Sequence, residues 1–543
     1  MVLTRRTFLK GAFSTVAWTC TRSYAGDNNR PNILFIMSDD HTSQAIGAYG
    51  RRLAKLNPTP TIDRLAREGM LFENVFCTNS ICTPSRANIM TGQHCQTNGV
   101  LDLNGTLSPQ QHYLAIEMKK AGYTTAMVGK WHLGQEPAHF DYYCVLPGQG
   151  KYHDPEFRVH GPQPWPKNTI QRKGHSSDVI TNLTIEWLDQ RDKSKPFFLM
   201  HHFKAPHDMF ENAKRYDEYL ADVEIPEPDN LYDQPAPGFG SVGTRGENDS
   251  LIHIIGSSVS KRMTRRNMGQ HMGVDPDLSD REYTHQAYQR YLKRYLRCVK
   301  GVDDNLKRLF DYLERQGLMD NTVIMYTADQ GFFLGEHDFI DKRWMYDEAM
   351  RMPFIVRYPK LVKPGKRNRW LINNADFAPT ILDLAGAKTP SYMQGRSFTG
   401  ALRGEAKPAD WRKATYYRYW MHMAHGHNNP AHFGIRTELY KLIFFYGCDF
   451  TPPLPEAAFT DTPKAKRVTK YGGNRYFPNT PPAWEFYDLK EDPHEMQNQY
   501  GNPKYRDVII ELKKELKRQR EALNETDSKY PHIQKIIDAH WGS

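Results

Sequence analysis

The stretch Asn32-Ile33-Leu34-Phe35-Ile36-Met37-Ser38-Asp39-Asp40 decides the fold. Residues 32–37 form a continuous apolar run, which is typical of a strand buried on both faces of a mostly parallel sheet. Two carboxylates follow at once, Asp39 and Asp40. In open α/β sheets, ligands bind beyond the carboxyl ends of the strands. The stretch therefore predicts a central strand that ends at a functional site.

Three more strands of this kind are expected, at residues 124–128, 197–201 and 322–327. Helices are expected between the strands, at residues 60–68, 182–190 and 283–315, the last as one long helix or two. Thr59 suits the N-cap of the first helix, Pro60 its first position and Gly69 its end. Strands separated by helices predict an α/β fold with a large mixed, mostly parallel sheet that helices sandwich.

The chain is expected to divide into a catalytic domain, residues 26–405, and a C-terminal α+β subdomain, residues 406–543. Residues 225–282 are rich in Pro, Gly, Ser and Asn, which predicts a long insertion or lid in the catalytic domain. Strands and then a charged helix are expected in the C-terminal part, at residues 416–420, 431–437, 440–446, 485–489 and 508–523. This order predicts a smaller antiparallel sheet with a helix.

Composition narrows the class of protein. Hydrophobic residues make up 39% and charged residues 25% of the 543 residues, as in globular proteins. No apolar run reaches the roughly 18 residues that a membrane span needs, so no transmembrane segment is expected. The formal net charge of +10 falls to +6 without the four basic residues of positions 1–25. A basic balance suits a polyanionic partner, but without basic blocks or zinc-finger spacing nucleic acid is not expected.

The N-terminus has the character of an address label. Residues 4–10, Thr-Arg-Arg-Thr-Phe-Leu-Lys, resemble the twin-arginine export signal of bacteria. A weakly apolar stretch and then Ser23-Tyr24-Ala25 follow, which predicts a signal peptide cleaved after Ala25. The resemblance implies the twin-arginine export machinery as a partner and a periplasmic or secreted protein. A lipid anchor on Cys20 is the weaker alternative.

Two strand exits carry oxygen ligands. Asp39 and Asp40 follow the first strand, and Asp329 and Gln330 follow the strand at residues 322–327. Carboxylate and amide oxygens are hard donors that suit Ca²⁺ or Mg²⁺. The spacing therefore predicts one cation site shared by the two exits, with Ca²⁺ preferred.

The stretch Cys82-Thr83-Pro84-Ser85-Arg86, with Thr91-Gly92 downstream, carries the most specific signal. Pro84 at the start of a helical pattern places Cys82 at a helix N-terminus, which would activate a thiolate. The stretch also resembles the signature of type I sulfatases, members of the alkaline phosphatase superfamily, and in particular bacterial carbohydrate sulfatases. The resemblance implies that a maturation enzyme oxidises Cys82 to formylglycine, before export if export carries the folded chain.

Other stretches match the same family. They are Asp39-Asp40, Gly129-Lys130-Trp131-His132-Leu133-Gly134, Ala205-Pro206-His207, Thr327-Ala328-Asp329-Gln330-Gly331, Asp341-Lys342-Arg343 and a C-terminal marker in residues 485–493. Gln330 departs from the Asn or His of many members but keeps an amide oxygen. The resemblance implies that Asp39, Asp40, Cys82, Asp329 and Gln330 hold the metal.

The resemblance also implies a mechanism. Hydrated formylglycine attacks the sulfur of a sulfate ester, near Ca²⁺ and Arg86. Lys130 and Lys342 neutralise the charge of the sulfate oxygens. His207 protonates the departing alcohol, and His132 takes the proton that allows sulfate to leave.

Export, basic charge and the insertion favour a sulfated poly- or oligosaccharide as substrate. Glucosamine 6-sulfate of glycosaminoglycans, ulvan and carrageenan are the candidates. Arg343, His422, His432 and Arg436 are candidate substrate-binding residues, and aromatic side chains near them could stack on sugars or form the core of the small sheet. The alternatives are a phosphodiester or phosphonate monoester hydrolase of the same superfamily, an inactive glycan-binding homologue, and a cysteine hydrolase that uses Cys82 directly.

Overall fold

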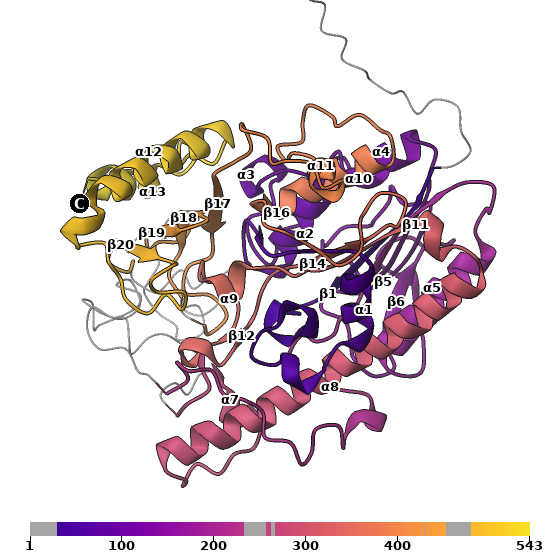
Figure 1. Cartoon of the computed structure of the whole chain (residues 1–543), viewed down its shortest axis with the longest axis horizontal. Coiled ribbons are helices and arrows are strands. Elements are labelled where there is room, and N and C mark those ends of the chain that lie inside the picture. The colour runs from indigo at the N-terminus through magenta and orange to yellow at the C-terminus, as the bar shows by residue number, and fades with distance from the viewer. Residues whose placement is uncertain (1–29, 233–256, 262–265, 428, 452–478, 543) are drawn as a thin grey trace, which may run out of the picture.

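The computed structural model describes residues 30–232, 257–261, 266–427, 429–451 and 479–542 (Figure 1). Its centre is a ten-stranded sheet in the order β15-β2-β14-β11-β1-β8-β4-β5-β6-β7. In that order the strands are Lys366–Asn368, Met70–Phe72, Phe354–Arg357, Thr322–Ala328, Asn32–Ser38, Phe197–His202, Thr124–Lys130, Tyr142–Leu146, Glu156–Val159 and Thr169–Gln171. The central strands β11, β1, β8, β4 and β5 run parallel, and β14, β6 and β7 are antiparallel to their neighbours. The predicted mixed, mostly parallel sheet is confirmed.

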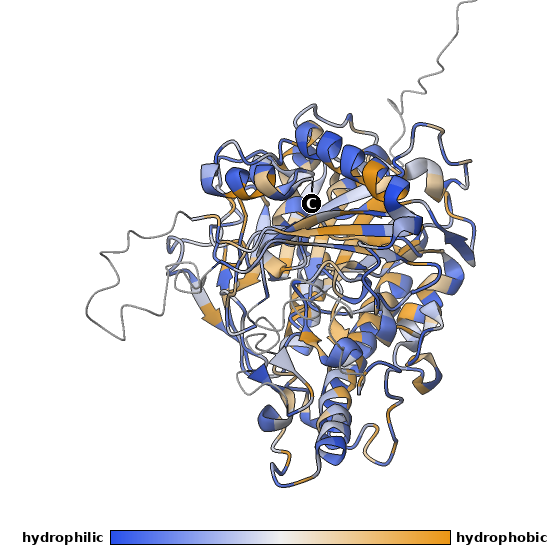
Figure 2. Cartoon of the chain, turned by 90° about the vertical axis from the view of Figure 1, so that its left-hand side faces the viewer, coloured by the Kyte–Doolittle hydropathy of each residue, from blue (hydrophilic) through white to orange (hydrophobic). Residues whose placement is uncertain are grey.

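Helices cover both faces of this sheet. Successive side chains of β1 point to opposite faces and are apolar on both, so each face needs a layer that buries it. Leu34 and Ile36 pack toward α1 (Pro60–Glu68), α5 (Ser176–Gln190) and the long α8 (Asp280–Arg315). Ile33, Phe35 and Met37 pack on the other side, toward α2 (Cys82–Thr91), α4 (Leu114–Lys120) and α10 (Phe377–Leu384). Figure 2 shows hydrophobic residues gathered on the strands and hydrophilic ones on the outer faces of the helices.

The start of α1 differs from the expectation in one respect. Its bounds and its end at Gly69 match, but the Thr59 side chain forms no capping hydrogen bond. The carboxylate of Asp303 in α8 accepts from the backbone N–H groups of Thr61 and Ile62 at 2.9–3.1 Å instead. The free N–H groups of a helix N-terminus need such a partner, and here a distant helix supplies it.

The C-terminal part forms a four-stranded antiparallel sheet, as expected. Its strands are β17 (Ala414–Tyr419), β18 (His432–Thr437), β19 (Tyr440–Phe445) and β20 (Ala483–Asp488). One face packs on α12 (Arg506–Ala522) and on α13 (Pro531–His540), a helix that was not predicted. The other face joins the core of the large sheet through side chains such as Tyr417 and Ile443. Figure 1 shows α12 and α13 on the outer side of this small sheet.

The insertion predicted at residues 225–282 is described in part. Residues 233–256 and 262–265 lie outside the described residues. Between and after these gaps, β9 (Ser257–Ser258) pairs with β10 (Arg266–Asn267), and the short helix α7 (Met268–His271) leads into α8. The insertion thus returns to the body of the protein as an ordered ribbon.

No helix among the described residues is long and apolar enough to cross a membrane. The predicted signal peptide at residues 1–25, with Cys20, lies outside the described residues. The remaining six cysteines are all described, and all six are free and buried.

Candidate active site

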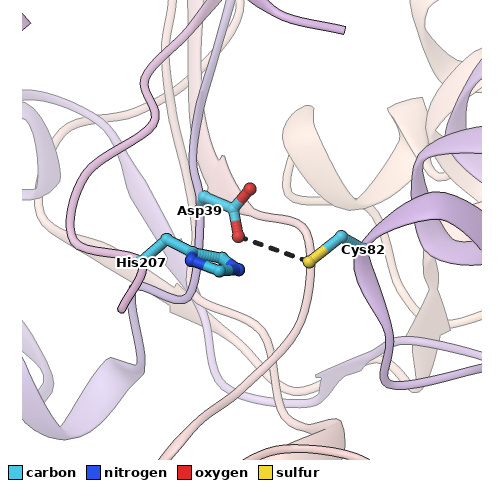
Figure 3. A group of neighbouring side chains, drawn as sticks. All are labelled: Asp39, Cys82 and His207. Atoms are coloured by element: carbon cyan, nitrogen blue, oxygen red, sulfur yellow. Dashed lines mark hydrogen bonds between the residues drawn. The ribbon is translucent and has the colours of Figure 1, made fainter. Parts of the chain in front are cut away.

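The predicted strand exits meet at one edge of the large sheet. Asp39 and Asp40 follow β1, Lys130 ends β4, His207 follows β8 and Asp329 follows β11. Because these strands are parallel neighbours, their carboxyl ends lie side by side. The N-terminus of α2 brings Cys82 to the same place, as Figure 3 shows for Asp39, Cys82 and His207.

Three carboxylates form the floor of the site. One oxygen from each of Asp39, Asp40 and Asp329 lies within 4.8 Å of the others, and all three residues are fully buried. Burial raises the pKa of Asp40 and of Asp329 above its usual range, and for both the negative charge of Asp39 adds to the rise. Buried carboxylates this close need positive charge among them.

The set fits a hard cation. The Oε1 atom of Gln330 is buried without a hydrogen-bond partner among the described residues, while its Nε2 donates to Asp40. An unpaired buried amide oxygen beside three carboxylates is the donor chemistry that Ca²⁺ and Mg²⁺ select.

Cys82 is the first residue of α2, and Arg86 lies one turn later. The Cys82 Sγ atom is 3.5 Å from Asp39 Oδ1. The Arg86 guanidinium contacts Asp39 Oδ2 and Asp329 Oδ2, each at 3.0 Å, and thereby ties the nucleophile helix to the carboxylates. Burial raises the pKa of the Cys82 thiol well above its usual value, an effect opposite to the activation expected at a helix N-terminus.

Two lysines add positive charge. Lys130 pairs with Asp39 and bonds the side chain of Gln149, and Lys342 Nζ lies 2.7 Å from Asp40 Oδ2 and 3.2 Å from Asp341. Both lysines are almost fully buried. Together with Arg86 they gather three cationic side chains at the site, a charge that suits a tetrahedral anion.

Two histidines complete the site. His207 Nε2 is 3.7 Å from Asp40 Oδ2, and its Nδ1 is 2.6 Å from Asp208 Oδ1. Burial and then the charges of Lys130 and Lys342 lower the pKa of His207 to about 4. Burial and then Lys130 also lower the pKa of His132, whose backbone has φ 52° and whose Nδ1 is buried without a partner among the described residues.

Comparison with known proteins agrees with this geometry. The model of a family named Sulfatase matches residues 31–387, and that of N-sulphoglucosamine sulphohydrolase, C-terminal, matches residues 335–451 and 465–522. The chain belongs to the sulfatase family. The predicted sulfuric ester hydrolase is thereby confirmed.

Relatives of this sulfatase cover nearly its whole length. An N-acetylglucosamine-6-O-sulfatase from Bacteroides thetaiotaomicron is 38% identical over 546 residues, which are 94% of this chain and 89% of the relative. A protein solved in complex with its substrate D-glucosamine-2-N,6-O-disulfate has a TM-score of 0.75 at 38% identity, covering 92% of this chain and 99% of that one. Phosphonate monoester hydrolase of Agrobacterium radiobacter, with a TM-score of 0.64 at 20% identity and coverages of 91% and 96%, shares the fold alone.

The four candidate substrate-binding residues of the sulfatase lie in different surroundings. Arg343 follows Lys342 at the edge of the site, where its guanidinium contacts Asp341 at 3.0 Å and the Tyr419 hydroxyl at 3.1 Å. Asp341 also meets His427 at 2.8 Å. Arg343 therefore lies beside Lys342 at the edge of the site.

The other three candidates lie in or beside the small sheet, and their substrate contact stays a prediction. Arg436 pairs with Asp347 at 2.8 Å. His432 is fully buried among aromatic rings, including Phe445 with ring centroids 4.8 Å apart. His422 is buried and accepts a hydrogen bond from the Ala431 backbone N–H. The nearby aromatic side chains of Tyr416, Tyr417, Tyr419 and Trp420 are buried, as the core alternative for them predicts.

The site also contains residues without an assigned role in the sequence motifs. They are Gln149 beside Lys130, Asp208 beside His207, and Lys204, whose buried ammonium lies 4.5 Å from the ring centroid of Tyr152. Asp208 and Lys204 flank His207 in the sequence, so proximity to the motif was the available signal. Gln149 follows β5, an exit that the strand analysis did not include. His41, His201 and His202 bond Tyr326, Thr184 and the Lys130 backbone oxygen, so they support the sheet edge.

Proposed function

We propose that this sulfatase removes the 6-O-sulfate from glucosamine units of a sulfated glycan. The observation that carries the proposal is the buried cluster around Cys82, in which Arg86, Lys130 and Lys342 pair with three carboxylates. Two relatives with 38% identity support this sugar and position. One is named an N-acetylglucosamine-6-O-sulfatase, and the other was solved with D-glucosamine-2-N,6-O-disulfate as its substrate. Ulvan and carrageenan remain the competing substrates.

The cation of the proposal is Ca²⁺, with Mg²⁺ as the alternative. Asp39, Asp40, Asp329 and Gln330 would hold it, and their oxygen-only donor set is the support for this choice. When bound, the cation supplies positive charge against the sulfate oxygens. Cys82 at the rim of this set is the residue that maturation to formylglycine would convert into a hydrated aldehyde nucleophile.

The remaining chemistry belongs to side chains that the structure describes. Lys130 and Lys342 bind the sulfate oxygens and neutralise the charge that develops on them. His207 presents Nε2 to the site and donates a proton to the leaving alcohol oxygen, while Nδ1 faces Asp208. His132, on the opposite exit after β4, is the base that accepts a proton when sulfate leaves.

A substrate panel tests the function. Desulfation of glucosamine 6-sulfate oligosaccharides, ulvan and carrageenan fragments, and phenyl phosphonate esters is measured with the protein matured by a formylglycine-generating enzyme. We expect release of sulfate from the glucosamine 6-sulfate compounds. Activity should be lost completely in Cys82→Ala and kept in Cys144→Ala, which changes a matched buried cysteine in β5. Faster release from ulvan or carrageenan, or faster hydrolysis of the phosphonate ester, would refute the proposed substrate.

Maturation and export are proposed from the sequence. Mass spectrometry of the peptide with residues 77–95 should show an aldehyde at Cys82 in active protein, and an intact thiol in active protein would support the cysteine hydrolase instead. Replacing Arg5 and Arg6 by Lys should retain the protein in the cytoplasm, if the twin-arginine machinery carries it to the periplasm or beyond. Unchanged export would contradict that route.

A further inference from the structure

A chain of charged contacts leads from the insertion to a catalytic histidine. His207 Nδ1 lies 2.6 Å from Asp208 Oδ1 and 2.9 Å from the backbone oxygen of Asp208. Arg266 Nη2 donates to Asp208 Oδ2 at 2.8 Å. Arg266 belongs to β10, within the insertion at residues 225–282. Asp208 thus uses one oxygen for the imidazole and the other for the guanidinium.

The ribbon that carries Arg266 is firmly attached. Asp338 accepts hydrogen bonds from the backbone N–H groups of Val259 at 3.0 Å and Ser260 at 2.7 Å. The side chain of Asn267 accepts from the hydroxyl of Tyr283 in α8. Arg266 is therefore held from both sides, by the loop that precedes β13 (Ile340–Asp341) and by the longest helix.

Arg266 lies beside Asp208 and also near the loop that holds His425, Gly426 and His427. Its Nε is buried without a hydrogen-bond partner in the part of the chain that the structure describes, and its side chain is 28% exposed. Among described residues, Asp208 is the carboxylate that it meets. An effect of Arg266 on His207 would thus be transmitted by Asp208, whereas an effect on His427 and Asp341 would not.

We propose that Arg266 is a positioning residue, which acts through Asp208 to hold the His207 ring with Nε2 toward the leaving oxygen of the substrate. The inference rests on the proposed role of His207 as the acid of a sulfate ester hydrolysis. A carboxylate at Nδ1 helps to fix the orientation of a catalytic imidazole.

In the step that needs this proton, the nucleophile at position 82 forms a bond to sulfur as the S–O bond to the alcohol breaks. The electron pair of the broken bond stays on the alcohol oxygen. The Nε2–H of protonated His207 donates its proton to that oxygen, so the histidine is left neutral and the alcohol leaves uncharged. A leaving group that is stable as an anion does not need this proton.

Leaving-group dependence therefore tests the inference. The values of kcat and KM are measured for aryl sulfates of increasing leaving-group pKa, from 4-nitrophenyl to phenyl, and for glucosamine 6-sulfate. For Arg266→Met we expect a fall in kcat of roughly 10- to 100-fold on glucosamine 6-sulfate, a smaller fall on phenyl sulfate and less than threefold on 4-nitrophenyl sulfate, since general acid catalysis contributes about 10²–10⁴-fold in total. Arg266→Lys should recover part of the loss.

Two further variants isolate the route through Asp208. Asp208→Asn should reproduce the leaving-group dependence, and the double variant Asp208→Asn/Arg266→Met should lose no more than Asp208→Asn alone. Lys261→Met is the matched control, because it removes a cation of the same insertion that meets Asp280 at 3.8 Å instead of Asp208. This control should leave the leaving-group dependence unchanged.

Equal losses on all leaving groups, or losses that add in the double variant, would overturn the inference. A wild-type protein that hydrolyses aryl sulfates but not glucosamine 6-sulfate would refute the proposed substrate alone. The aryl sulfate series would still decide the role of Arg266 in that case. The 4-nitrophenyl sulfate activity also shows whether each variant is folded.

Discussion

Substituting Asp40 by Asn should change stability in opposite directions with and without the cation. Asp40 lies within 4.8 Å of both Asp39 and Asp329. At an effective dielectric constant of about 20, each repulsion costs about 3.5 kcal/mol or more, and attraction to Lys342 Nζ at 2.7 Å offsets about 6 kcal/mol. Burial of the charge adds a penalty, in keeping with the raised pKa of Asp40. Without a cation, the carboxylate at this position is thus destabilising.

A bound cation reverses the sign of the effect that the Asp40 carboxylate has on stability. At 1,000 times its dissociation constant, a ligand stabilises the folded state by about 4 kcal/mol. In EDTA we expect the free energy of unfolding of Asp40→Asn to be about 1–3 kcal/mol higher than that of wild type. In Ca²⁺ we expect the variant to show little of the stabilisation that the bound ion gives to wild type. Asn accepts the left-handed backbone of residue 40, with φ 63°, as well as Asp does.

Thermal unfolding of both proteins in EDTA and in millimolar CaCl₂ measures the four values. Asn88, which is buried in α2, offers a control as Asn88→Asp, which should be destabilised in both solutions. If Asp40→Asn lowers the melting temperature in EDTA as much as in Ca²⁺, Asp40 stabilises the fold by itself and the cation argument is wrong.

Three other predictions concern single side chains. Asp527→Asn leaves the buried Arg418, 2.6 Å away, and Arg520 without their carboxylate, and should cost about 3–5 kcal/mol in unfolding experiments. Burial raises the pKa of Glu525 to about 7 from roughly 4.3 in the unfolded chain, so the folded state favours the protonated form and stability should fall as pH rises between these values. The variant Glu525→Gln should remove that fall and add about 1–3 kcal/mol of stability at pH 8, which melting curves at several pH values would show. Lys342→Met should lower kcat/KM for sulfate esters by about 10²–10³-fold in steady-state assays, and a loss below fivefold would exclude contact with the transferred sulfate.

The sequence predicts the site well where the residues follow strands. Asp39, Lys130, His207 and Asp329 each come directly after an apolar run, and parallel strands must bring such positions to one edge. The place of Cys82 at a helix N-terminus is equally predictable, because Pro84 marks the start of its helix. Local pattern and global topology agree at all of these positions.

Contacts between distant segments could not be predicted in this way. Asp303 caps α1 across 241 positions or more, and nothing in the local sequence distinguishes it from a surface acid. Arg266 reaches Asp208 from another element, and no spacing encodes that pair. Arg436 pairs with Asp347 of another element, a contact that the residue type alone could not predict.

Helix α8 limits where residues can be inserted into the chain or deleted from it. Tyr283 bonds the insertion, the hydroxyl of Tyr295 bonds the backbone oxygen of Asp40, and Asp303 caps α1. One residue inserted between Tyr295 and Asp303 would rotate these two points against each other by about 100° and shift them by about 1.5 Å. Exposed positions of α8 should therefore accept many substitutions, while a single insertion or deletion should misalign the loop of Asp40 and helix α1 together.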